Sequence, residues 1–196
     1  MNKLIATIGI LVAATGASAQ HHQHGHQPQQ AASSPYAGQQ DRSIKSLSEK
    51  EVVDLLAGQG MGLAKAAELN GYPGPAHVLE HAVALGLSGE QRSASDALMR
   101  KHKAAAREIG KELVAAERGL DAAFAGRTID AARLSVLTRE IGLKQAQLRE
   151  EHLRTHLEQT ALLTPEQVNR YAQLRGYAAA PAIQPAAATA SQPKHH

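Results

Sequence analysis

Apolar residues recur at steps of three and four along two long stretches of the chain, the spacing that places them on one face of an α-helix. The connection between the stretches, Gly126-Arg127-Thr128, is short enough that the second helix should return antiparallel to the first. The first stripe consists of Leu98, His102, Ala105, Ile109, Leu113, Ala116, Leu120 and Phe124. The second consists of Leu134, Leu137, Ile141, Gln145, Leu148, His152 and His156. The pattern therefore predicts a long antiparallel helical hairpin over about residues 89–125 and 130–162.

Capping signals predict four shorter helices around this hairpin. A capping box, in which Ser or Thr is followed three residues later by Glu or Gln, occurs at Ser48, Ser88 and Thr164. The box at Ser88 opens the hairpin and the other two open short helices. The expected short helices begin after Ser48, near Met61, at Pro75 and at Pro165, and they end at Gly58, Asn70-Gly71, Gly86 and Gly176. The fold class expected is all-α, a long antiparallel helical hairpin with short flanking helices and disordered N- and C-terminal tails.

The N-terminal residues 1–19 have the features of a secretory signal peptide. Lys3 supplies the positive charge, a short apolar run follows, and Ala17-Ser18-Ala19 provides a small-residue cleavage site after Ala19. We expect export to the periplasm and no stable membrane insertion after cleavage. Residues 20–43 are rich in Gln and His and are expected to be disordered, residues 44–177 form the helical domain, and residues 178–196 form a disordered Ala/Pro-rich tail.

The amino-acid composition limits the kinds of metal site and of ligand binding that the chain can support. The chain has no cysteine, so thiolate chemistry is excluded and a site for a soft metal has to use His and Met. The formal net charge is only +3 and aromatic residues make up 3% of the chain, so a basic stripe with stacking aromatics, as in nucleic-acid binding, is not present.

The hairpin brings histidines together at its open end. Folding about residue 127 places His102 opposite Leu153, between His152 and His156, and places Met99 opposite His156. The helix that carries His77 and His81 joins the same end. Converging imidazoles suit Zn, Cu, Ni or Co, and a thioether adds affinity for Cu(I). The candidate metal ligands are His77, His81, His102, His152, His156 and Met99, with a looser N-terminal cluster of His21, His22, His24 and His26.

Two other interpretations stay open for these residues. Histidines on a helix are often structural, and His152 and His156 would lie beside the core if Leu153 and Leu157 formed the buried seam instead.

An enzyme is not expected, because the His-x-x-x-His pairs lack the internal Glu of a zinc protease and no nucleophile elbow accompanies the Ser, His and Asp residues.

Two related motifs carry a resemblance to a known family. Leu163-Thr164-Pro165-Glu166-Gln167 is a complete LTxxQ motif, and Leu87-Ser88-Gly89-Glu90-Gln91 is a variant with Ser for Thr. Over about residues 75–177 the chain resembles the Spy/CpxP family of periplasmic stress proteins, which includes zinc-resistance-associated proteins and CnrX-like heavy-metal sensors. The resemblance implies a helical hairpin and a homodimer. Its sensor branch implies metal ligands at His77 and His81 and at His152 and His156, where that branch has His and then Met.

The resemblance leaves two functions to separate. The first is a periplasmic transition-metal-binding stress, resistance or sensor protein, with a possible membrane regulatory partner. The alternative is an ATP-independent chaperone (holdase) that binds unfolded client proteins and whose histidines are incidental. A holdase calls for an exposed basic and apolar face, whereas a metal protein calls for buried, converging imidazoles. The basic residues in question are Arg100, Lys101, Lys103 and Arg107.

Overall fold

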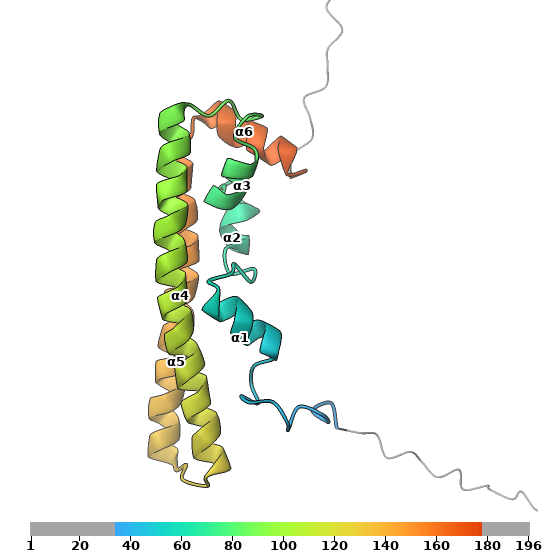
Figure 1. Cartoon of the computed structure of the whole chain (residues 1–196), viewed down its shortest axis with the longest axis vertical. Coiled ribbons are helices and arrows are strands. Elements are labelled where there is room, and N and C mark those ends of the chain that lie inside the picture. The colour runs from blue at the N-terminus through green and yellow to red at the C-terminus, as the bar shows by residue number, and fades with distance from the viewer. Residues whose placement is uncertain (1–33, 178–196) are drawn as a thin grey trace, which may run out of the picture. The chain divides into compact units, whose positions relative to one another are not determined.

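The computed structural model describes residues 34–177, and every regular element in this range is a helix (Figure 1). The expectations for the signal peptide, the N-terminal histidine cluster and the Ala/Pro-rich tail therefore lie outside the described residues. Residues 34–37 belong to a separate unit, so the account below concerns residues 38–177, which begin with turns and bends. The helices are α1 (Glu49–Leu56), α2 (Lys65–Glu68), α3 (Pro75–Glu80), α4 (Gly89–Ala125), α5 (Ala131–Ala161) and α6 (Pro165–Leu174).

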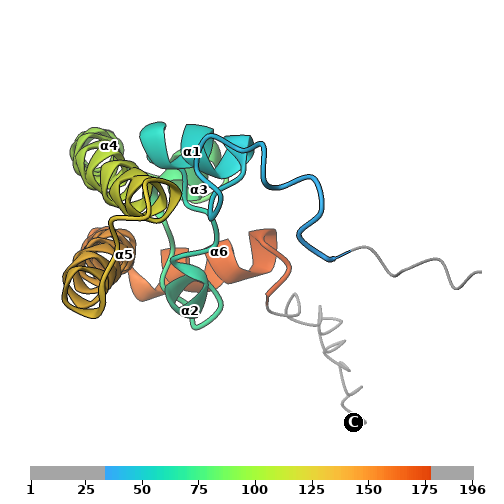
Figure 2. The same cartoon turned by 90° about the horizontal axis from the view of Figure 1, so that it is seen from below.

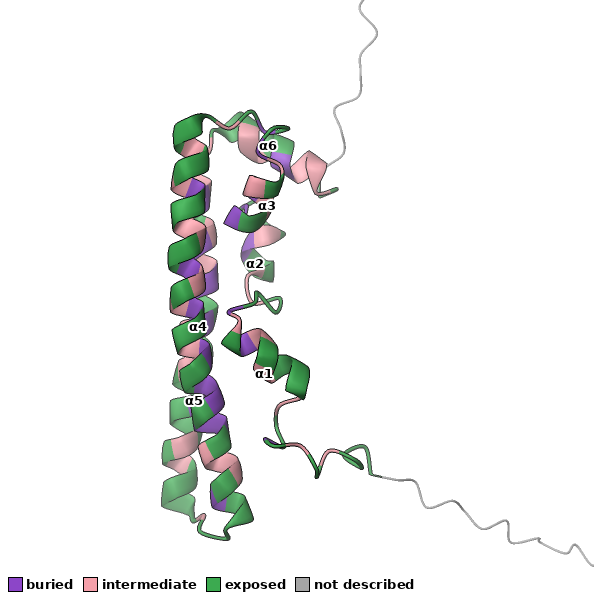
Figure 3. Ribbon diagram, in the orientation of Figure 1, coloured by how far each residue is buried: buried purple, intermediate pink, exposed green. Residues whose placement is uncertain are grey.

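The two long helices α4 and α5 pack side by side as an antiparallel hairpin, which confirms the predicted fold class (Figures 1 and 2). The apolar stripes are buried or partly buried along most of their length, with Leu113 and Ile141 in the main core. At the tip of the hairpin the prediction is wrong: Phe124 is 54% exposed and Leu134 is 38% exposed. Within residues 38–177 no further helix covers the tip, where the ribbon is mostly coloured as exposed (Figure 3). A seam between two helices alone therefore leaves the side chains of Phe124 and Leu134 partly in solvent.

The short helices lie along one side of the hairpin. α1 and α3 contact α4, and α2 contacts α5 (Figure 2). The approach of α1 is very close because α4 has a glycine there. A Cβ atom on Gly110 would lie 2.2 Å from the carbonyl oxygen of Leu55. α3 is shorter than expected and ends at Glu80, after which residues 81–86 form turns.

The two LTxxQ-type motifs meet at the open end of the hairpin. Gln91 and Gln167 each close the capping box of their own helix by accepting a bond from the backbone N–H of Ser88 and Thr164. Their side-chain amides also face one another, with N···O distances of 2.9 and 3.0 Å in the two directions. Each amide nitrogen donates further to a backbone carbonyl, that of Leu162 for Gln91 and that of Leu85 for Gln167. This pair of glutamines therefore joins the start of α4 to the start of α6.

No helix in residues 34–177 combines the length and the apolar character that crossing a lipid bilayer requires.

Candidate metal site

A cavity of about 580 Å³ lies between the hairpin and the segment that runs from the end of α1 to the start of α3. α4 contributes Met99, His102 and Lys103, and α5 contributes His152, Thr155 and His156. The opposite wall comes from the short segments. Its residues include Gly58, Gln59, Met61, Lys65, Glu68, Gly74 and His77, with Tyr177 at the C-terminal end of the described chain.

The innermost candidate metal ligands are two imidazoles in direct contact across the hairpin. The rings of His102 and His152 lie edge to face, with centroids 4.5 Å apart. Both residues are buried, at 6% and 4% exposure. The hairpin register brings them together, as the short connection at residues 126–128 predicts.

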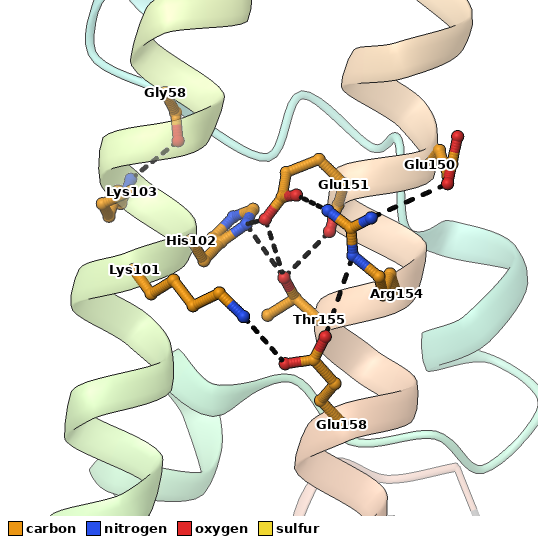
Figure 4. A network of polar contacts seen from close by, with 9 residues as sticks. All are labelled: Gly58, Lys101, His102, Lys103, Glu150, Glu151, Arg154, Thr155 and Glu158. Carbon is orange, nitrogen blue, oxygen red and sulfur yellow. Dashed lines mark hydrogen bonds and ion pairs between the residues drawn. The ribbon is translucent and has the colours of Figure 1, made fainter.

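Glu151 and Thr155 hold the His102 ring in place. His102 Nδ1 lies 3.3 Å from Glu151 Oε1 and 3.0 Å from Thr155 Oγ1 (Figure 4). A carboxylate only accepts hydrogen bonds, so Nδ1 carries the proton and donates. The lone pair of the neutral His102 ring is then on Nε2.

Burial keeps both imidazoles neutral. Desolvation, together with the nearby His102, lowers the pKa of His152 to about 4. Desolvation also lowers the pKa of His102, while the hydrogen bond that its Nδ1 donates to Glu151 opposes this change. His152 Nε2 has no hydrogen-bond partner although it is buried. The two rings thus present neutral nitrogen donors, which is the protonation state that binds metal ions.

A network of charges outside the cavity positions Glu151. The carboxylate of Glu151 pairs with the guanidinium of Arg154. Arg154 also lies 3.7 Å from carboxylate oxygens of Glu150 and Glu158, and Lys101 lies 3.8 Å from Glu158 (Figure 4). The network runs from the surface to the buried carboxylate that orients His102.

His156 from α5 and His77 from α3 approach Glu68 of α2 from the two sides of the cavity. His156 Nδ1 donates to the carbonyl oxygen of Tyr72 at 2.7 Å and lies 3.7 Å from Glu68 Oε2. A Cβ atom on Gly74 would lie 2.7 Å from the His156 ring, so a glycine is needed where α3 begins. His77 Nδ1 lies 4.0 Å from Glu68 Oε1.

Glu68 is the functional candidate that the sequence analysis missed. Its Oε1 accepts hydrogen bonds from the hydroxyls of Tyr171 at 2.6 Å and Tyr177 at 3.1 Å, and Arg175 Nε lies 3.4 Å away. The contacts join α2 to α6 and to the cavity wall. The signal available was that Glu68 is the one acidic residue in the stretch 55–79.

The candidate ligands are distributed unevenly. His77, Met99, His102, His152 and His156 line the same cavity, whereas His81 does not line it and forms the C-cap of α3. The structure therefore does not bring His81 to this cavity, and His81 as a metal ligand stays a prediction. The open alternative in which Leu157 joins a buried seam is wrong, since Leu157 is 55% exposed while His152 is buried. In the part of the chain that the structure describes, no three His, Asp or Glu side chains are assembled as a ready metal-binding group.

The donors that are present suit a transition metal by their chemistry. His152 has an unpartnered buried nitrogen, His102 has an orienting carboxylate on its other nitrogen, and Met99 supplies a thioether on the same cavity wall. Imidazole bound through one nitrogen and held by a carboxylate at the other is the usual arrangement of a metal-binding histidine.

Comparison with protein-family models matches residues 55–170 to the family described as heavy-metal resistance. The matched range contains every histidine that lines the cavity. No curated protein and no solved structure matches the chain.

Proposed function

The chain belongs to the heavy-metal resistance family, and on that premise we propose that it binds a transition-metal ion in this cavity as a periplasmic protein of metal-stress resistance or sensing. The observation that carries the proposal is the His152 imidazole. It is buried, neutral and in contact with His102, and its Nε2 has no partner. A buried polar atom without a partner costs about 1–3 kcal/mol, and a bound metal ion removes this cost.

His102 and His152 are the proposed inner ligands. His156, one turn after His152 in α5, and His77, on the opposite wall, are additional candidate ligands, and both lie near Glu68. The role proposed for the protein is binding rather than catalysis, and the export features of residues 1–19 support the periplasm as its location.

The charges along α4 favour metal binding over the holdase alternative. Lys103 donates to the carbonyl oxygen of Gly58 at 2.9 Å, and Lys101 lies 3.8 Å from Glu158. Arg100 is paired with Asp96 on its own helix. The contact with Gly58 withdraws Lys103 from a free basic surface for unfolded clients, whereas the side chains of Lys101 and Arg100 remain 73% and 69% exposed.

Metal titration of purified protein tests the proposal. The background variant carries alanine at the terminal histidines, so that loose binding there does not mask the cavity. These are His21, His22, His24, His26, His195 and His196. In this background His152→Gln removes the proposed ligand, and His81→Gln is the matched control because His81 does not line the cavity.

We expect stoichiometric binding of at least one transition metal by isothermal titration, a loss of at least tenfold in affinity in His152→Gln, and no change in His81→Gln. Equal affinities in the two variants would refute the site. Suppression of client aggregation by the metal-free protein, without any metal binding, would favour the holdase.

We also propose that the protein forms a homodimer through the outer face of α5. Val136, Leu143 and Leu157 are 62%, 55% and 55% exposed there. They are separated by multiples of seven residues, the spacing of coiled-coil contacts, and the resemblance to the Spy/CpxP family implies a dimer as well. Light scattering after size exclusion should give a dimer that Leu143→Glu converts to a monomer and that Val83→Glu, at an exposed position after α3, leaves intact. A monomeric unmodified protein would refute this interface.

A further inference from the structure

We propose that the ion taken by this cavity is soft and monovalent, Cu(I) or Ag(I), and that the thioethers of Met99 and Met61 bind it together with the imidazoles of His102 and His152. This inference rests on the proposed function, because it names the class of metal for that same cavity.

All the sulfur of the chain beyond Met1 lies at this cavity. The sequence contains three methionines and no cysteine. Met61 and Met99 are the two that follow Met1, and both line the cavity with the histidines. Thioether ligands select Cu(I), whereas carboxylate and carbonyl oxygens suit harder ions. Two methionines beside the buried imidazoles are therefore a pointer to a soft ion.

Met99 is placed to act with the imidazole pair. It precedes His102 by three residues in α4, which puts both side chains on one face of the helix. His102 in turn contacts His152 across the hairpin. One sulfur and two neutral nitrogens thus come from adjacent positions, a set that suits the low coordination numbers of Cu(I) and Ag(I).

Met61 approaches from the opposite wall with a strained backbone. Its φ is 46°, in the left-handed region that a side chain disfavours by roughly 1–2 kcal/mol. The nearby Gly62 also has a positive φ, so the loop already uses glycine where the backbone requires this conformation. Strain of this kind is typical of ligand-binding positions. Here it occurs at a methionine that lines the cavity and is 42% exposed as a whole residue.

The charges around the cavity favour a single positive charge on the ion. Lys65 and Lys103 line the cavity. The acidic lining residue, Glu68, already accepts hydrogen bonds from Tyr171 and Tyr177 and faces Arg175. Repulsion from an ammonium group is proportional to the charge of the ion, so it is twice as large for Zn²⁺, Ni²⁺ or Co²⁺ as for Cu(I).

The test compares metals and sulfur ligands in the terminal-histidine background described above. Cu(I) affinity is measured anaerobically by competition with bicinchoninate, and Ag(I), Zn²⁺, Ni²⁺ and Co²⁺ affinities by isothermal titration. The variants are Met99→Leu and the Met61→Leu, Met99→Leu double variant, which keep the apolar volume. Leu98→Ile is the matched control, since it changes a neighbouring apolar side chain without removing sulfur, and melting curves confirm that each variant folds.

We expect Cu(I) and Ag(I) to bind more tightly than the divalent ions, and Met99→Leu to weaken Cu(I) binding at least tenfold while Leu98→Ile changes it less than twofold. X-ray absorption should show a Cu–S shell that the double variant loses. Binding of divalent ions that His152→Gln abolishes, with no dependence on Met61 or Met99, would overturn this inference and leave the proposed function standing. Absence of binding of any metal would overturn both.

Discussion

Two glycines in the long helices should respond in opposite ways to the same substitution. Gly110 faces α1, and a Cβ atom there would lie 2.2 Å from the carbonyl oxygen and 2.8 Å from the carbonyl carbon of Leu55. Gly142 in α5 has no atom within 4 Å of its Cβ position. The contrast isolates packing from helix propensity, because alanine is the better helix former by about 1 kcal/mol at both positions.

The expected change in the free energy of unfolding of Gly110→Ala follows from how far α1 has to move. A normal contact between the new methyl group and the Leu55 carbonyl requires a displacement of about 1 Å. Leu55 is 4% exposed and lies in the main core with Ala106, so such a displacement opens a packed region. Overpacking of this kind costs typically 1–3 kcal/mol, and the gap that it opens adds to the cost. After subtracting the gain in propensity, Gly110→Ala should lower the free energy of unfolding by about 2 kcal/mol, whereas Gly142→Ala should raise it by about 0.5–1 kcal/mol.

Urea denaturation followed by far-UV circular dichroism measures both changes. For a chain of this size each kcal/mol corresponds to a shift in Tm of roughly 2–4 °C, so thermal melting provides a second reading. A displaced α1 also moves the cavity wall at Gly58, and metal affinity should therefore fall in Gly110→Ala and not in Gly142→Ala. If both variants are stabilised to a similar extent, the close approach of α1 to α4 is not present in solution.

Three further predictions concern stability. Gln91→Glu keeps the capping box but removes the amide that donates to Gln167 and Leu162, so a loss of about 2 kcal/mol in urea denaturation is expected, and an unchanged midpoint would contradict the paired-glutamine arrangement. Burial lowers the pKa of His152 to about 4 in the folded state, against about 6.5 in the unfolded chain, so the contribution of neutral His152 to stability is complete above pH 6.5 and is lost as the pH falls toward 4. The free energy of unfolding of the metal-free protein should therefore fall by roughly 2 kcal/mol between about pH 7 and pH 5. In His152→Gln the dependence of unfolding free energy on pH should be weaker. Tyr171→Phe removes the hydroxyl that donates to Glu68 and should lower the free energy of unfolding by about 1.5–3 kcal/mol. A decrease of less than about 0.5 kcal/mol, as is usual for substitutions of exposed residues, would show that this hydrogen bond does not stabilise the fold.

Most of the fold could be predicted because its signals are local. Capping boxes at Ser48, Ser88 and Thr164 form as the sequence indicates, and the short connection near residue 127 fixes the register of the hairpin. The early end of α3 was not predictable from periodicity, since the residues after Glu80 remain apolar although the chain turns there. The exposure of Phe124 depends on which other helices reach the tip, and this is a property of the tertiary structure alone.

The candidate site also has one part that local signals predict and another that depends on the tertiary structure. The contact between His102 and His152 follows from helix rise and loop length, so the sequence predicts it. The role of Glu68 does not follow from spacing, because its partners Tyr171 and Tyr177 lie more than a hundred residues later and reach it only through the path of α6. Long-range polar contacts of this kind leave no periodic trace in a single sequence.

The arrangement also explains why glutamine occupies the last position of both LTxxQ-type motifs. A glutamate can close a capping box, since only an acceptor is needed for the backbone N–H. It cannot also donate to the facing side chain and to a carbonyl oxygen, which Gln91 and Gln167 both do. The paired amides lie where α4 and α6 start, and the histidine that contacts His102 lies two to three turns before the end of α5. Each LTxxQ-type motif thus starts a helix and, through its glutamine, also holds together the open end of the hairpin, where the imidazoles meet.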